Sequence, residues 1–285
     1  MSIVITGATG HLGRLTISSL QAAGVPAAEI VAAVRSPEKA ADLAAQGIRL
    51  LVTDYDEPST WEFQPGDRVL LISSNAVGSR VAQHSAVIDA AATAGVAQLV
   101  YTSIFGADTA DFRLAEEHQA TEKKIIESGL PHTFLRNNWY TELFTGMTGL
   151  FLEHGAIVNN VTADARIAFA PRSDYAAAAA AVLTQDGHLN KAYELGGDVA
   201  WSYPELAAEL AQQAGTAVVH KTVTDAEQQD LLVAAGLPAG YAEILVDANA
   251  GISRGALNGT PGELARLLGR PTEPMAESIA KALAG

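Results

Sequence analysis

Residues 3–13 read IVITGATGHLG, a short β-branched run followed by glycines at positions 7, 10 and 13. The apolar run predicts a buried strand, and the residues after Gly10 predict the start of a helix. In that context Gly7 permits a tight turn, Gly10 lets backbone N–H groups approach a pyrophosphate, and Gly13 lets the helix pack closely on the strand. The segment therefore predicts a dinucleotide-binding turn, with a simple glycine-rich turn as the alternative.

The second predicted strand ends in Val34-Arg35, and Arg35 lies 22 positions beyond Gly13. Proteins that bind NAD commonly carry an acidic residue here for the ribose hydroxyls. A guanidinium instead suits a 2′-phosphate, which predicts NADPH as the preferred cofactor and NADH as the weaker one, with Lys39 as a helper. The alternative is that Arg35 is a solvated charge at a strand end.

Apolar runs alternate with helical patterns through the first half of the chain. Parallel strands joined by crossover helices produce this alternation, so we predict an α/β fold with a doubly wound, Rossmann-like parallel sheet. The expected strands span residues 3–6, 30–34, 48–53, 69–73, 99–103 and 133–136. The expected helices span residues 12–23, 37–46 and 79–94.

The alternation ends after Trp139, where shorter elements follow. We expect strands over 155–160, 167–170 and 192–195, and helices over 174–183, 202–214, 225–235, 264–268 and 275–283. The sequence thus predicts an NAD(P)-binding domain over residues 1–150 and a smaller α+β substrate domain, or cap, over 151–285. The strand near 192–196 is a candidate to return to the main sheet.

Composition excludes several functions. Eighteen Lys and Arg against 32 Asp and Glu give a net charge of −14, which repels the phosphates of nucleic acids and anionic membranes. The longest apolar stretch, residues 175–183, is mostly Ala and too short to cross a bilayer. The sequence contains no Cys, and no His and carboxylate spacing indicates a metal site. With no targeting leader evident, we expect a cytoplasmic protein, and a homo-oligomer stays open.

Polar and aromatic residues follow three of the predicted strands. Ser73-Ser74-Asn75 follows the fourth strand, Tyr101-Thr102-Ser103 lies on the fifth, and residues 135–140 (LRNNWY) close the sixth. Ligands of such sheets bind at the carboxyl ends of the strands, so these groups are expected to line a cofactor or acceptor, or else to serve as helix caps and packing residues. The candidates for placing a flat acceptor are Asn137, Asn138, Trp139 and Tyr140.

The usual catalytic pair of short-chain dehydrogenases, a Tyr followed four residues later by a Lys, is absent from every Tyr of this sequence. The corresponding helix offers His118 and then Glu122-Lys123 instead. His118 is more commonly a surface helix residue than an acid, so catalytic residues stay unassigned.

Together these motifs resemble the NmrA-like atypical short-chain dehydrogenases. The opening residues 5–13, Arg35, Ser73-Ser74, residues 101–103 and the run 135–140 carry the likeness, and 174–177, 193–195 and 206–210 extend it nearly end to end. The resemblance implies a flavin-free, metal-free oxidoreductase that passes hydride from NADPH to a quinone. It implies cofactor contacts at Gly7, Ala8, Thr9, Gly10, His11, Leu12, Arg35, Ser73, Ser74, Asn75, Asn137, Asn138, Trp139, Tyr140, Thr141, Glu142 and Ala170. Asn138 stands where close relatives are expected to carry Gly, which adds a side chain near the nicotinamide.

A quinone is already a strong hydride acceptor, so the protein needs mainly to orient its ring and stabilise the developing phenolate. A dedicated proton donor is therefore dispensable, which agrees with the missing Tyr and Lys pair. Two other functions fit the same features. One is a dinucleotide-binding redox sensor or regulator without turnover, and the other is a reductase of another conjugated carbonyl such as an enone.

Overall fold

The computed structural model describes residues 1–284, which form two compact units. The first unit comprises residues 1–104, 117–137 and 172–194. The second comprises residues 105–116, 138–171 and the chain from 195 onward. The single boundary predicted between residues 150 and 151 differs from this division, because the chain passes between the two units several times.

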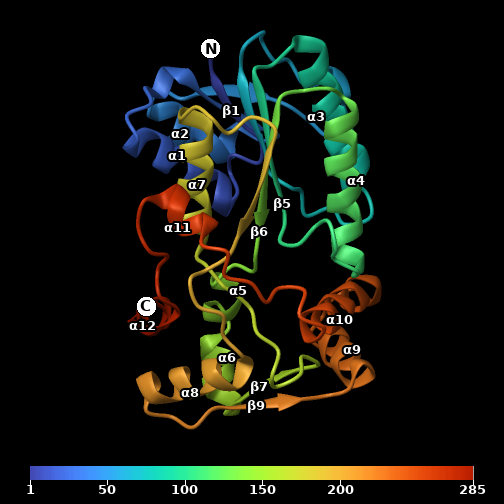
Figure 1. Ribbon diagram of the computed structural model, residues 1–285, viewed down its shortest axis with the longest axis vertical. Coiled ribbons are helices and arrows are strands. Elements are labelled where there is room, and N and C mark those ends of the chain that lie inside the picture. The colour runs from blue at the N-terminus through green and yellow to red at the C-terminus, as the bar shows by residue number, and fades with distance from the viewer. Residues whose placement is uncertain (285) are drawn as a thin grey trace. The chain divides into compact units, whose positions relative to one another are not determined.

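A seven-stranded sheet forms the centre of the first unit, in the order β3-β2-β1-β4-β5-β6-β8 (Figure 1). The strands are β1 (Ile3–Ile5), β2 (Ile30–Val34), β3 (Arg49–Val52), β4 (Arg68–Leu71), β5 (Gln98–Ile104), β6 (His132–Asn137) and β8 (Lys191–Leu195). The pairings among the first six strands are parallel. The predicted Rossmann-like sheet is confirmed, and β8 joins it next to β6 as the sequence allowed.

Helices cover both faces of this sheet (Figure 1). On one face, α1 (His11–Ala22) packs against α7 (Arg172–Thr184), and on the other lie α3 (Arg80–Ala94) and α4 (Arg113–Glu127). Strand residues such as Ile5, Leu70 and Leu99 are fully buried, as continuous apolar runs between two helical layers should be. Short 3₁₀ segments η1 (Ala27–Glu29), η2 (Pro37–Ala40) and η3 (Pro58–Thr60) and helix α2 (Ala41–Ala45) complete the connections. No helix within residues 1–284 is long and apolar enough to span a membrane.

The second unit has its own core and a two-stranded parallel sheet of β7 (Ala156–Asn159) and β9 (Val219–Thr222). The helices of this unit are α5 (Glu142–Thr145), α6 (Thr148–His154), α8 (Tyr203–Ala214), α9 (Asp225–Ala234), α10 (Ala239–Ser253), α11 (Glu263–Leu268) and α12 (Met275–Ala284). The strand predicted over 167–170 is wrong. Ile167 bridges to Trp201 and Ala170 to Tyr140, so the segment pairs with two different partners and no continuous ladder forms.

Candidate functional site

The glycine turn joins β1 to α1 with a backbone that side chains would disrupt. Gly7 has a φ of +57°, and its carbonyl accepts a hydrogen bond from the Gly10 amide at 2.9 Å. A Cβ at Gly13 would lie 2.4 Å from the Gly7 carbonyl oxygen and 2.8 Å from the Ala8 Cα. Because both neighbours are backbone atoms, this close helix-to-strand approach requires glycine at position 13.

Helix α1 begins directly after this turn, at His11, and Gly10 supplies no side-chain cap. The first N–H groups of a helix have no intrahelical acceptor, and the helix dipole adds partial positive charge there. No acidic residue occupies the first turn of α1. The turn and the helix start therefore fit a pyrophosphate, the group that a dinucleotide presents.

Arg14 connects the glycine turn to the segment after β2, a contact that the sequence analysis missed. Its Nε donates to the Thr9 carbonyl at 3.3 Å, and its guanidinium donates to the Lys39 carbonyl at 2.7 Å and to the Asp42 carboxylate. The Arg14 guanidinium in turn lowers the pKa of the Asp42 carboxyl. The side chains of Arg35 and Lys39 are exposed in this segment, and neither forms an ion pair within residues 1–284. The position of Arg14 directly after the third glycine, Gly13, is the sequence feature that could have indicated this contact.

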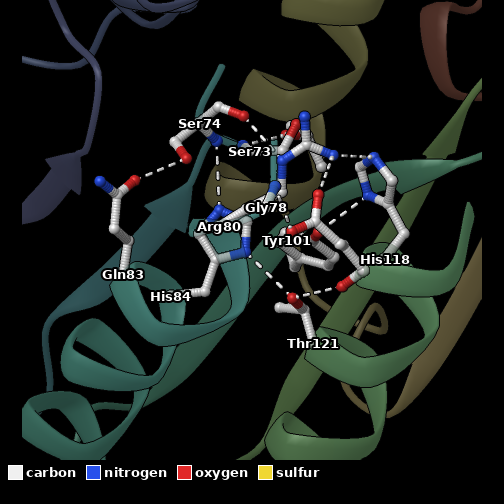
Figure 2. Close-up of polar contacts among 11 residues, drawn as sticks. Ser73, Ser74, Gly78, Arg80, Gln83, His84, Tyr101, His118 and Thr121 are labelled. Atoms are coloured by element: carbon white, nitrogen blue, oxygen red, sulfur yellow. Dashed lines mark hydrogen bonds and ion pairs between the residues drawn. The ribbon is translucent and has the colours of Figure 1, made fainter. Parts of the chain in front are cut away.

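The loop after β4, which carries Ser73 and Ser74, is held by a buried polar network in the first unit (Figure 2). The Ser73 amide donates to Thr102 Oγ1 at 2.9 Å, and the Ser74 amide donates to His84 Nε2 at 3.1 Å. Arg80 Nε donates to the Ser74 carbonyl at 2.7 Å. Side chains of β5 and α3 thus hold the backbone of this loop in place, while Asn75 is exposed.

Two histidines of this network hold defined tautomers. Since the Ser74 amide can only donate, His84 Nε2 accepts, and its Nδ1–H faces Thr121 Oγ1 at 3.0 Å. By the same reasoning His118 Nε2 accepts from Arg80 at 3.1 Å, and its Nδ1–H faces the Tyr101 hydroxyl at 2.8 Å (Figure 2). Burial and then the Arg80 cation lower the pKa of His84 to about 3 and the pKa of His118 well below its usual value. Both side chains are neutral supports of the loop, and the surface position expected for His118 is wrong.

The other charged candidates of α4 also serve the fold. Arg136 donates to both carboxylate oxygens of Glu122, at 3.0 and 2.7 Å, and to Glu194 at 2.9 Å. Lys123 pairs with Glu127 at 3.8 Å on the surface. Tyr101 is fully buried against α3 and α4, so it does not line a ligand site. Glu122 and Lys123 are therefore already committed to ion pairs.

The segment after β6 runs beside Ala170 in the second unit. The Thr141 amide donates to the Ala170 carbonyl at 2.9 Å, and the Ala170 amide donates to the Trp139 carbonyl at 3.3 Å. The Asn138 side chain is used within this unit, since Nδ2 donates to the Leu257 carbonyl at 3.0 Å and Oδ1 accepts from the Trp139 amide at 2.7 Å. The structure thus brings the predicted residues 139–141 together with Ala170, and the Asn138 side-chain amide is hydrogen-bonded within the protein.

A cavity of about 310 Å³ lies within the second unit. Apolar side chains dominate its walls, and five of the fifteen lining residues are aromatic: Trp139, Phe144, Phe151, Phe169 and Tyr203. Trp139 was a predicted acceptor residue, whereas Tyr140 is not among the lining residues. Gln228 on α9 also lines the cavity, and the sequence analysis missed it because nothing in a single polar helix residue signals a cavity.

These features define a dinucleotide-binding protein, and comparison with known families agrees. A family model described as NAD(P)H-binding matches residues 7–186. The chain belongs to this NAD(P)H-binding family. Within residues 1–284, no cluster of three or more His, Asp or Glu side chains is arranged to hold a metal ion.

Three relatives cover nearly the whole chain. Quinone oxidoreductase 2 of Escherichia coli strain K12 is 46% identical over 279 residues, 97% of each chain, and the crystal structure of E. coli QOR2 complexed with NADPH matches with a TM-score of 0.95 at 45% identity over 99% of each chain. The Citrobacter triphenylmethane reductase complexed with NADP(H) matches with a TM-score of 0.93 at 38% identity, over 99% of this chain and 100% of that one. An NmrA-like family oxidoreductase of Aspergillus flavus is 29% identical over 99% of this chain and 95% of its own. The resemblance to the NmrA-like dehydrogenases is thereby confirmed.

Proposed function

We propose that this protein is a flavin-independent oxidoreductase that transfers hydride from NADPH to a quinone. The observation that carries the proposal is the 46% identity to E. coli Quinone oxidoreductase 2 along 97% of both chains. The reaction consumes NADPH, a quinone and one proton, and yields NADP⁺ and the hydroquinone. NADPH supplies the hydride from its nicotinamide ring when it is bound.

The cofactor is proposed to bind along the ends of β1, β2, β4 and β6 and the following segments. The glycine turn holds the pyrophosphate, and the exposed Arg35 meets the 2′-phosphate, which makes NADH the weaker cofactor. The proposed contacts are Gly7, Ala8, Thr9, Gly10, His11, Leu12, Arg35, Ser73, Ser74, Asn75, Asn137, Asn138, Trp139, Tyr140, Thr141, Glu142 and Ala170. Asn138 takes part through its backbone, because its side chain is committed.

The chain needs no dedicated acid in this reaction. Of the candidates from the sequence, His118 is a buried neutral support and Glu122 is paired with Arg136. The one proton that the reaction consumes comes from water, and the protein orients the quinone ring through the segment 137–140. We further propose a cytoplasmic location and a protein without flavin, metal, nucleic-acid or membrane partners.

Steady-state oxidation of NADPH with a panel of quinones and enones tests the function. We expect turnover with quinones by protein that carries no flavin, and no gain when flavin is added. Tight NADPH binding without turnover of any acceptor would favour a redox sensor instead, and turnover with enones alone would favour a reductase of conjugated carbonyls.

A further inference from the structure

The cavity of the second unit has walls suited to a flat, uncharged molecule. None of its lining residues is Lys, Arg, Asp or Glu, and aromatic side chains supply much of the surface. Its volume of about 310 Å³ lies at the lower end of the range for ligand pockets, which fits one or two fused rings. A charged or extended ligand would be poorly matched.

The entrance of the cavity is also apolar. Leu143, Met147 and Val158 line the cavity, yet these residues are 48%, 42% and 38% exposed, so they mark its open side. Exposed apolar residues gathered around an opening are typical of a binding surface rather than of an ordinary protein exterior. The cavity is therefore accessible to an apolar ligand from outside.

Gln228 is the exceptional polar residue of this cavity. It is only 6% exposed, and its side-chain Oε1 has no hydrogen-bond partner within residues 1–284. A buried amide without a partner costs stability, so such a group in a cavity indicates a ligand. An amide can donate to a carbonyl oxygen through its NH₂ group and accept from a hydroxyl through its oxygen.

Other polar groups of the wall are already used by the protein. Asn159 Oδ1 accepts from the Val161 amide and from His220 Nε2, each at 3.0 Å, and Asn249 Nδ2 donates to Asn160 Oδ1 at 2.8 Å. These bonds hold the wall together and set Gln228 apart.

The hydroxyl of Tyr203 is the second group open to a ligand. Its ring stacks on His220 with centroids 5.3 Å apart, and the hydroxyl makes no hydrogen bond to residues 1–284. Burial raises the pKa of Tyr203 to about 12, so the group stays protonated and able to donate. Tyr203 and Gln228 thus offer two donors in a mostly apolar cavity.

Gln228 is held in place by the start of α9. Thr224 Oγ1 accepts from the Glu227 amide and Glu227 accepts from the Thr224 amide, which forms a capping box. Asn160 Nδ2 donates to Asp225 Oδ1 at 2.8 Å and to the Val246 carbonyl at 3.0 Å, which ties α9 to α10. A recognition group on such a fixed helix turn is preorganised.

We propose that Gln228 selects the acceptor in this cavity: its amide recognises a ring oxygen of the quinone, and the Tyr203 hydroxyl acts as a second donor. The inference rests on the proposed function and adds the residues that select the acceptor. The amide donates to the quinone carbonyl and, after rotation by 180°, accepts from the hydroquinone hydroxyl. One side chain therefore suits both substrate and product.

The test compares Gln228→Leu with Gln229→Leu, the same change at the next position of α9, where the side chain does not line the cavity. With 1,4-naphthoquinone, Gln228→Leu should raise the quinone KM about two- to tenfold, as expected for one neutral hydrogen bond, and leave the NADPH KM unchanged. Its Tm should be equal to or above that of the parent, because an unpaired buried amide is removed. A structural role would instead lower Tm and leave the quinone KM unchanged.

Calorimetric titration of 1,4-naphthoquinone into the protein saturated with NADP⁺ measures the affinity for the quinone without turnover. Gln228→Leu and a second variant, Leu232→Trp, which narrows the cavity from a half-buried wall position, should both weaken binding. If both variants bound the quinone as tightly as the parent protein, the inference would be overturned. A change in kcat with an unchanged quinone KM would overturn it as well. Failure of the parent protein to turn over any quinone would sink the proposed function, while the titration would still report whether the cavity binds the ring.

Discussion

The glycine turn of the first unit and the aromatic cavity of the second recognise their ligands in opposite ways. The turn is built from consecutive residues, and its chemistry lies in backbone conformation, as the +57° φ of Gly7 illustrates. The cavity collects side chains from Trp139 to Asn249, and its chemistry lies in ring faces and one unpartnered amide. The pyrophosphate site is thus encoded in one short stretch that tolerates little change, whereas the cavity depends on side chains far apart in the chain.

Gly13→Ala is expected to have the largest effect on cofactor binding. The added Cβ would lie 2.4 Å from the Gly7 carbonyl oxygen, so the turn must open. We expect the free energy of unfolding to fall by about 3 kcal/mol, the upper end for overpacking. We also expect the NADPH affinity to fall more than a hundredfold, because the opened turn no longer fits the pyrophosphate. Calorimetric titration with NADPH measures it.

Gly240→Ala on α10 is the matched control, because a Cβ there would meet nothing within 4 Å and Gly240 is not a proposed cofactor contact. Its affinity should fall far less than that of Gly13→Ala. Equal affinities for NADPH in the parent and in folded Gly13→Ala would remove the turn from the cofactor site.

Arg35→Asp tests whether this side chain selects NADPH over NADH. Two charge-assisted bonds from a partly solvated guanidinium predict a preference for NADPH over NADH of about ten- to a hundredfold. The carboxylate should reverse it, because it repels the 2′-phosphate and accepts from the ribose hydroxyls. The ratio of kcat/KM for the two cofactors decides, and an unchanged ratio in Arg35→Asp with a changed one in Lys39→Ala would transfer the role to Lys39.

The histidine support of the loop at Ser74 should make the protein sensitive to acid. An unfolded histidine binds a proton near pH 6.5, whereas folded His84 binds one only near pH 3. The contribution of His84 is complete above about pH 6.5 and is lost as the pH falls, by about 1.4 kcal/mol per unit, or about 2 kcal/mol at pH 5. The depressed pKa of His118 adds to the loss in the same direction.

Denaturant unfolding between pH 7.5 and 4.5 checks this slope. His84→Gln should flatten it, and His154→Gln, at an exposed position, should not. A slope that is the same in the parent and in His84→Gln would show that other groups govern the acid sensitivity.

Substitutions of Trp139 and Tyr140, the two aromatic residues of the segment 137–140, should differ in their effect on the quinone KM. Trp139 lines the cavity and Tyr140 does not, so Trp139→Ala should raise the quinone KM about three- to tenfold through loss of an aromatic contact, while Tyr140→Ala should change it less. The NADPH KM is measured in parallel, because both residues are also proposed cofactor contacts. Equal effects of the two substitutions on the quinone KM would show that the acceptor does not bind in the cavity.

The sequence predicted what depends on local pattern. The strands of the main sheet follow from buried apolar runs, and the turn follows from glycine spacing at 7, 10 and 13. Residues 167–170 were misread because their pairing partners lie far along the chain, at Tyr140 and Trp201. Gln228 was missed because burial without a partner is a property of tertiary packing and leaves no pattern in the sequence.

A single-turnover measurement shows whether hydride passes directly from NADPH to a quinone. Flavin-free protein in excess over NADPH is mixed rapidly with 1,4-naphthoquinone, and the experiment is repeated with NADPH deuterated at C4 on either face. We predict one hydroquinone per NADPH and a slower rate with deuterium on one face only. Bound NADPH that stays reduced in the presence of the quinone would contradict the account.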